Sequence, residues 1–114
     1  MEPTVQPVKY QVSCLPDSMN GIDYEAFALD VEYTGLGRWA VRKHSRCLDV
    51  DGRWDYEPRP LEREDDWLDT HRFDLDTALE LAKRAAPHVK VNGWTVERVL
   101  AEEAAAKDPA EGED

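Results

Sequence analysis

Strict alternation of apolar and polar residues constrains the fold of this chain more than any other feature of its sequence. In the run from Tyr24 to Thr34, apolar residues recur at every second position: Phe27, Leu29, Val31 and Tyr33. A period of two predicts a strand with one buried and one solvated face. Shorter runs of the same kind predict further strands over Val8–Cys14, Arg38–Leu48 and Arg53–Tyr56.

Tight turns join these predicted strands. Gly35-Leu36-Gly37 and Asp51-Gly52 are typical hairpin connections, because glycine adopts positive φ freely. The alternation slips near His44-Ser45, which predicts a bulge inside a single strand from Arg38 to Leu48. Consecutive strands with short connections indicate an antiparallel meander of about four strands.

The second half of the chain changes to a helical period. Asp74 is predicted to cap a helix that ends at Pro87. Its apolar stripe comprises Leu75, Ala78, Leu79, Ala82 and Ala86. Thr95 is predicted to cap a second helix, and Val89 and Val91 allow a short fifth strand. Strands followed by helices predict an α+β domain with two helices packed on one face of the sheet.

The length of 114 residues suits one domain. We expect a flexible arm over residues 1–7, a single domain over 8–104 and a disordered acidic tail over 105–114. No apolar run has the length of a membrane helix, and the first residues show no secretory signal pattern. The sequence therefore predicts a cytoplasmic protein whose cysteines, Cys14 and Cys47, are reduced and act as small core residues.

Acidic residues dominate the charge, and they are concentrated in two segments. The net charge is −11, of which residues 49–82 carry −8 and residues 101–114 carry −5. A negative field repels nucleic acid and anionic membranes and attracts basic partners. The charge therefore argues against nucleic acid and against membranes as partners.

The densest acidic cluster surrounds Trp67. It consists of Glu62, Glu64, Asp65, Asp66 and Asp69. Exposed acids around a tryptophan predict a contact surface for a basic protein partner, because tryptophan is enriched at binding hot spots. A solvated loop explains the same acids. A further alternative is a divalent-metal site formed by Asp65, Asp66 and His71, since carboxylate and imidazole groups are metal ligands.

Three aspartates around Gly52 superficially resemble a calcium-binding loop. They are Asp49, Asp51 and Asp55. The later ligands of such a loop are missing, and a β-turn explains Asp51-Gly52 without a metal. The sequence therefore predicts a hairpin here and no metal site.

A basic strand offers an alternative function. Arg38, Arg42, Lys43 and Arg46 lie around Trp39, and basic residues mixed with aromatics can bind single-stranded nucleic acid. Cross-strand pairing with Asp30 and Glu32 explains the same charges.

The sequence contains none of the compact catalytic motifs. His44, His71 and His88 show no metal-binding spacing, and the glycines form no phosphate-binding loop. A spatial pair of Cys47 with His44 or His88 is the remaining route to catalysis. We therefore expect a non-enzymatic protein without a cofactor; a small divalent-metal-dependent enzyme is a further alternative.

The second half of the chain resembles a group of small acidic proteins of high-GC actinobacteria and their phages. The resemblance lies in Trp54–Pro58, Arg63–Leu68, His71–Phe73, Ala85–Val89 and Val91–Gly93. It implies no activity, cofactor or binding residue. It implies an accessory protein of a phage or mobile element, in keeping with a small acidic interaction protein that binds a basic partner, for example as a nucleic-acid mimic.

Overall fold

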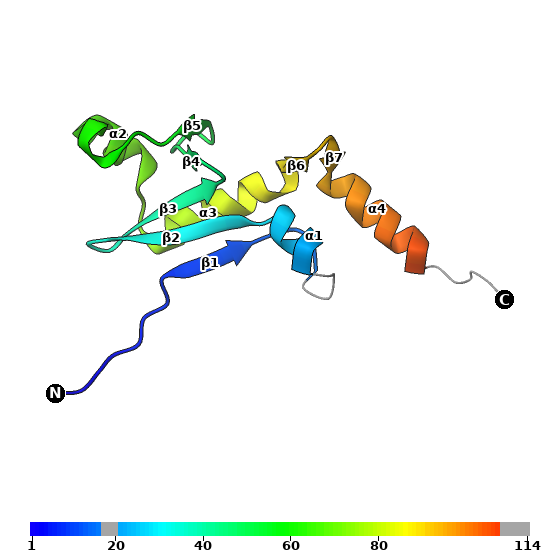
Figure 1. Ribbon diagram of the computed structural model, residues 1–114, viewed down its shortest axis with the longest axis horizontal. Coiled ribbons are helices and arrows are strands. Elements are labelled where there is room, and N and C mark those ends of the chain that lie inside the picture. Colours follow the sequence, from blue (N-terminus) through cyan, green and yellow to red (C-terminus); the bar gives the residue numbers. More distant parts are fainter. Residues whose placement is uncertain (17–20, 108–114) are drawn as a thin grey trace.

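The computed structural model describes residues 1–16 and 21–107, and its main element is a five-stranded antiparallel meander (Figure 1). The strands are β1 (Lys9–Val12), β2 (Leu29–Gly35), β3 (Arg38–Lys43), β4 (Arg46–Leu48) and β5 (Trp54–Tyr56), in the spatial order β1-β2-β3-β4-β5. This confirms the α+β class and the antiparallel meander predicted from the sequence. Before β1, residues 1–8 form neither helix nor strand.

The fifth strand arises because the predicted strand over Arg38–Leu48 is a hairpin. His44 and Ser45 form the turn, and Lys43 pairs with Arg46 across it. His44 has a φ of 57°, a left-handed conformation that reverses the chain direction. The prediction of a bulge was therefore wrong, since the slip in the alternation marks a turn.

The predicted strand over Tyr24–Thr34 begins later than expected. A helix, α1 (Gly21–Ala26), precedes it, and β2 starts at Leu29. Phe27, Ala28 and Leu29 are buried one after another, which a strand with one wet face does not allow. The period of two holds only from Leu29 onward.

The helices follow the sheet. They are α2 (Asp65–His71), preceded by a 3-10 turn η1 (Pro60–Glu62), then α3 (Leu75–Ala85), which runs into the 3-10 turn η2 (Ala86–His88), and α4 (Val96–Lys107). The Asp74 carboxylate accepts a hydrogen bond from the Thr77 N–H at 2.8 Å, as a capping residue should, and this bond lowers the pKa of Asp74. Thr95 caps α4 by accepting from the Arg98 N–H at 3.1 Å. Both predicted caps are confirmed.

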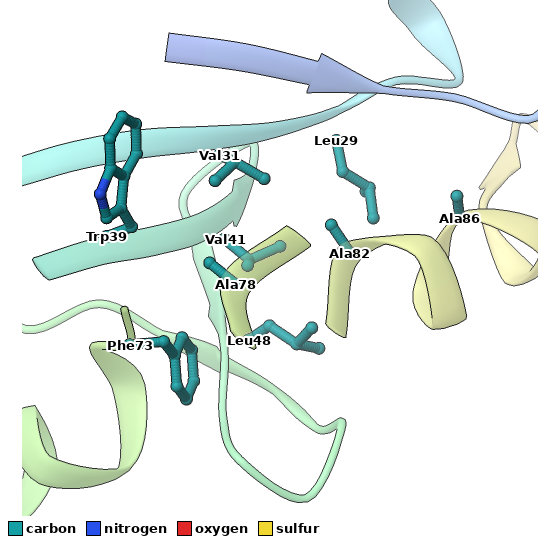
Figure 2. Close-up of a cluster of buried hydrophobic side chains, with 9 residues drawn as sticks. All are labelled: Leu29, Val31, Trp39, Val41, Leu48, Phe73, Ala78, Ala82 and Ala86. Carbon is teal, nitrogen blue, oxygen red and sulfur yellow. The ribbon is translucent and has the colours of Figure 1, made fainter. Parts of the chain in front are cut away.

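The main core lies between the sheet and α3 (Figure 2). Its fully buried members from the sheet include Leu29, Val31, Val41 and Leu48, each contributing about 1.5–3 kcal/mol by burial. They face alanines of α3 and η2, namely Ala78, Ala82 and Ala86. Small side chains on this face of α3 let the helix approach the sheet closely.

A second, smaller cluster holds the end of the chain. Leu15, Phe27 and Val96 are buried together, and Val96 belongs to α4. A two-stranded hairpin, β6 (Lys90–Val91) and β7 (Trp94–Thr95), leads into this helix. Figure 1 shows α4 extending away from the five-stranded sheet. The prediction that both helices cover the sheet is therefore correct for α3 and wrong for α4.

Two predicted boundaries differ at the end of the chain. The strand expected at Val89 and Val91 lies in the β6–β7 hairpin rather than in the main sheet. Helix α4 continues to Lys107, three residues into the segment expected to be a disordered tail. Residues 108–114 of that segment lie outside the described residues. No helix in the described part of the chain is long and apolar enough to cross a membrane.

Backbone contacts anchor the end of α2 to the sheet. Trp39 and Phe73 exchange two hydrogen bonds, of 2.7 and 2.9 Å, and form an isolated bridge beside β3. The Val50 N–H also donates to the Thr70 carbonyl at 2.9 Å. Helix α2 is thus held over the β4–β5 end of the sheet, remote from α4 (Figure 1).

Candidate functional site

Glu57, just after β5, gathers three arginines on one carboxylate. Its Oε2 accepts hydrogen bonds from Arg42 Nη2 at 2.7 Å, from Arg72 Nη2 at 3.0 Å and from Arg63 Nη2. Arg42 Nε donates to the other oxygen at 2.8 Å, which makes this pair bidentate. We call Glu57, Arg42, Arg63 and Arg72 the Glu57 cluster.

Burial and pairing with arginine act in opposite directions on the pKa of Glu57. Burial alone would raise the pKa of Glu57, but the hydrogen bond from Arg42 and the charges of the three arginines together lower it. The hydrogen bond to Glu57 is the largest cause of the raised pKa of Arg42, which also donates to Glu32 Oε1 at 2.8 Å. Glu57 is 14% exposed and Arg72 is 4% exposed, so these charges are held away from bulk water.

Aromatic stacking fixes the inner face of α2. The rings of Trp67 and His71 stack with centroids 4.0 Å apart and an interplanar angle of 4°. The guanidinium groups of Arg72 and Arg63 lie 5.2 and 5.9 Å from the Trp67 ring centroid. Trp67 is therefore half-buried and joins α2 to the Glu57 cluster. The sequence also predicts that this ring contacts a partner, and that role stays a prediction.

The predicted acidic residues lie on the outer side of this region. Glu62, Glu64, Asp65, Asp66 and Asp69 are all exposed. Glu62 lies 3.8 Å from Arg59, an exposed and weak pair. Within residues 1–16 and 21–107, the other four form no ion pair. We call these five residues the α2 acidic surface.

Two residues of the predicted basic strand bind other groups within the protein. Arg42 belongs to the Glu57 cluster, and Lys43 Nζ donates to the carbonyls of Ala26 and Ala28. Burial lowers the pKa of Lys43, although the charge of Asp30 opposes this. Cross-strand pairing, the simpler explanation offered by the sequence, accounts for Arg42 through Glu32.

The ends of the predicted basic strand remain exposed. Arg38 lies at the start of β3, and Arg46 stacks on Tyr56 with its guanidinium carbon 4.8 Å from the ring centroid. The four predicted nucleic-acid-binding residues therefore do not form one free basic surface.

The two cysteines have different environments. Cys47 is buried, and burial raises the pKa of its thiol, which favours the unreactive protonated form. Its Sγ lies 3.8 Å from the His71 carbonyl oxygen and 3.6 Å from Arg72 Nη1, while His44 and His88 are exposed. Cys14 is exposed, so the prediction that both cysteines are core residues was correct only for Cys47.

His71 lies beside a carboxylate that the metal-site hypothesis did not include. Its Nε2 is 2.8 Å from Asp55 Oδ2, and the structure does not bring Asp65 and Asp66 into a ligand group with it. Sequence reasoning also missed Glu57, Arg63 and Arg72. One signal in the sequence could have found Glu57. Asp55 and Glu57 are two positions apart, and residues at this spacing on a strand share a face.

Comparison with protein-family models, with curated proteins and with solved structures found no match to this chain.

Proposed function

We propose that this protein is a non-enzymatic interaction protein that binds a basic protein partner through the α2 acidic surface. The observation that carries the proposal is that basic and acidic side chains around α2 differ in how far they are paired. The basic groups on its inner side are paired within the Glu57 cluster, whereas the acids on its outer side are exposed and mostly unpaired. Among the described residues around α2, the charge that is left free to meet a partner is therefore mainly negative.

The anchoring of α2 supports this proposal. Thr70, His71 and Phe73 attach the end of the helix to the sheet. The Trp67 ring lies against Arg63 and Arg72 of the Glu57 cluster. A surface held in one geometry before binding loses little conformational entropy when it binds. In this proposal Trp67 supports the surface from below, and the acids make the contact.

The nature of the partner follows from the charge. Complementary charge accelerates association and makes affinity depend on salt. A protein that normally holds nucleic acid has a basic surface of the required kind, so the sharper form of the proposal is a nucleic-acid mimic of a phage or mobile element. The alternative, direct nucleic-acid binding by Arg38, Arg42, Lys43 and Arg46, requires charges that are partly committed to Glu57 and Glu32.

A salt-dependent titration tests the proposal. The probe is a fluorescent oligolysine peptide, and a single-stranded DNA oligonucleotide of matching charge serves as the opposite probe. We expect the full chain to bind the peptide and not the DNA, with affinity falling as salt rises. Binding of the DNA in preference to the peptide would contradict the proposal.

Paired variants locate the contact. Asp65→Lys with Asp66→Lys removes two acids from the first turn of α2, and Asp76→Lys with Glu97→Lys removes two acids from the first turns of α3 and α4. Both pairs change the net charge by the same amount. We expect only the first pair to weaken peptide binding and flatten its salt dependence. Equal losses from both pairs would show that net charge alone acts.

A further inference from the structure

We propose that Asp49, Asp55 and His71 form a binding site for a divalent transition-metal ion of the Zn²⁺ type. One ligand atom from each residue lies within 4.8 Å of the other two, and this is the one such group of three in the described part of the chain. The site lies where the β4–β5 hairpin meets the end of α2. It is independent of the α2 acidic surface, and none of its residues belongs to that surface.

The orientation of the His71 ring carries this inference. Nδ1 is 2.7 Å from the Trp67 carbonyl oxygen and 2.9 Å from Thr70 Oγ1. The carbonyl can only accept, so the shorter contact is a hydrogen bond in the tautomer that carries its proton on Nδ1. In that tautomer of the neutral ring, Nε2 presents a bare lone pair. Fixing of one ring nitrogen by a backbone carbonyl is the usual support for a histidine that binds metal through the other.

The lone pair of His71 Nε2 faces another acceptor. In the tautomer with the proton on Nδ1, Asp55 Oδ2 at 2.8 Å meets the lone pair of Nε2, and a cation bound by both atoms removes this repulsion. The His71 side chain is 5% exposed and the Asp55 side chain is 46% exposed, so the pair is rigid on one side and open to solvent on the other.

Asp49 provides the third ligand in a fixed position. Its Oδ1 accepts hydrogen bonds from the backbone N–H groups of Asp51 and Arg53, both at 2.8 Å. Oδ2 accepts no hydrogen bond from any described residue and is left for a cation. The turn that the sequence explained without a metal therefore orients a carboxylate toward His71.

The chemistry of the three ligands selects the class of ion. Two carboxylates and one neutral imidazole balance a divalent cation, and the imidazole favours Zn²⁺ and its neighbours over Mg²⁺ and Ca²⁺. Tetrahedral bonds of about 2.0–2.2 Å place two ligand atoms about 3.3–3.6 Å apart. The His71–Asp55 pair at 2.8 Å therefore opens slightly on binding, and a side-chain movement of Asp49 or Asp55 closes any pair near the 4.8 Å limit. Three protein ligands leave positions on the ion for water.

The test uses the full chain after removal of metal by a chelator, titrated with Zn²⁺ and separately with Mg²⁺. Calorimetry gives the stoichiometry, and ¹⁵N shifts of the imidazole nitrogens identify the ligand. We expect one Zn²⁺ per chain and a change at His71 Nε2 with His44 and His88 unmoved. Absence of Zn²⁺ binding would overturn the proposal and leave His71 as a hydrogen-bond partner of Asp55. A response at His44 or His88 alone would also overturn it.

Conservative variants complete the test. Asp49→Asn keeps the oxygen that accepts the two turn hydrogen bonds, so the hairpin is preserved while the ligand charge is lost. We expect Asp49→Asn and Asp55→Asn each to weaken Zn²⁺ binding by at least about tenfold. Asp51→Asn, an exposed neighbour outside the ligand group, should leave it unchanged. Equal affinity in the Asp49→Asn and Asp51→Asn variants would contradict the site, even if Asp55→Asn fails to fold.

Discussion

Single residues decide which charges of this protein are free. Glu57 brings Arg42, Arg63 and Arg72 together on the inner side of α2. The acids of the α2 acidic surface are exposed and mostly unpaired. The acidic excess was readable from the sequence. The pairing that produces the Glu57 cluster was not, because its members are separated by up to 30 positions and meet only after α2 folds back onto the sheet.

Glu57→Gln tests the Glu57 cluster. Removing the carboxylate leaves three arginines close together without their shared partner, which should lower the free energy of unfolding by about 3 kcal/mol at pH 7. Glu32→Gln is the control, since the 30% exposed Glu32 side chain shares only Arg42 and Lys9 and should cost less. Urea unfolding measures both. Equal losses would contradict a central role for Glu57.

The pH dependence of the unfolding free energy, compared between wild type and Glu57→Gln, gives an independent check. The pKa of Glu57 is lower in the folded state, so its stabilising effect is complete above the unfolded pKa of about 4.3 and is lost as pH falls through the folded pKa. The difference in unfolding free energy between wild type and Glu57→Gln should therefore be constant from pH 7 to about 5 and shrink at lower pH. A difference that grows on acidification would refute this sign.

Helices were predictable from the sequence where the signals for them lie close together in the chain. The cap at Asp74, the apolar stripe of α3 and the cap at Thr95 depend on residues within a few positions of each other. The hairpin at His44-Ser45 was missed because no glycine or asparagine marks its left-handed residue. The position of α4 was missed because its contact with Leu15 and Phe27 is long-range.

The left-handed turn between β3 and β4 can be tested by substitution. His44 has a φ of 57°, which costs an L-residue with a side chain about 1–2 kcal/mol and glycine little. His44→Gly should therefore keep or raise stability by up to about 1 kcal/mol, although glycine usually weakens a strand region. Ser45→Gly is the control without positive φ and should not stabilise. Thermal unfolding measures both, and a clear loss in His44→Gly would contradict the turn.

At the scale of the whole molecule, the described residues contain two hydrophobic clusters of unequal size. The larger joins the sheet and α3, and the smaller joins α4 to Leu15 and Phe27. The length, the charge and the two residue periods predicted one small acidic α+β domain but not this division. Elements with few buried contacts open before the rest of a domain.

Native-state hydrogen exchange should detect the division. We expect amides of α4 to exchange through a partial opening of lower free energy than that of β2 and β3. Val96→Ala should lower the opening free energy of α4 and leave the most protected amides of β2 nearly unchanged. A uniform loss over both regions would show that the two clusters unfold together.

The most direct test of the α2 acidic surface is chemical-shift mapping of the amide groups during an oligolysine titration. If α2 binds basic partners, the largest shifts will fall on residues 62–70, and high salt will abolish them. The Glu57 cluster behind α2 should show small changes, because its arginines stay paired. Shifts spread over every acidic segment, or centred on β3, would contradict this assignment.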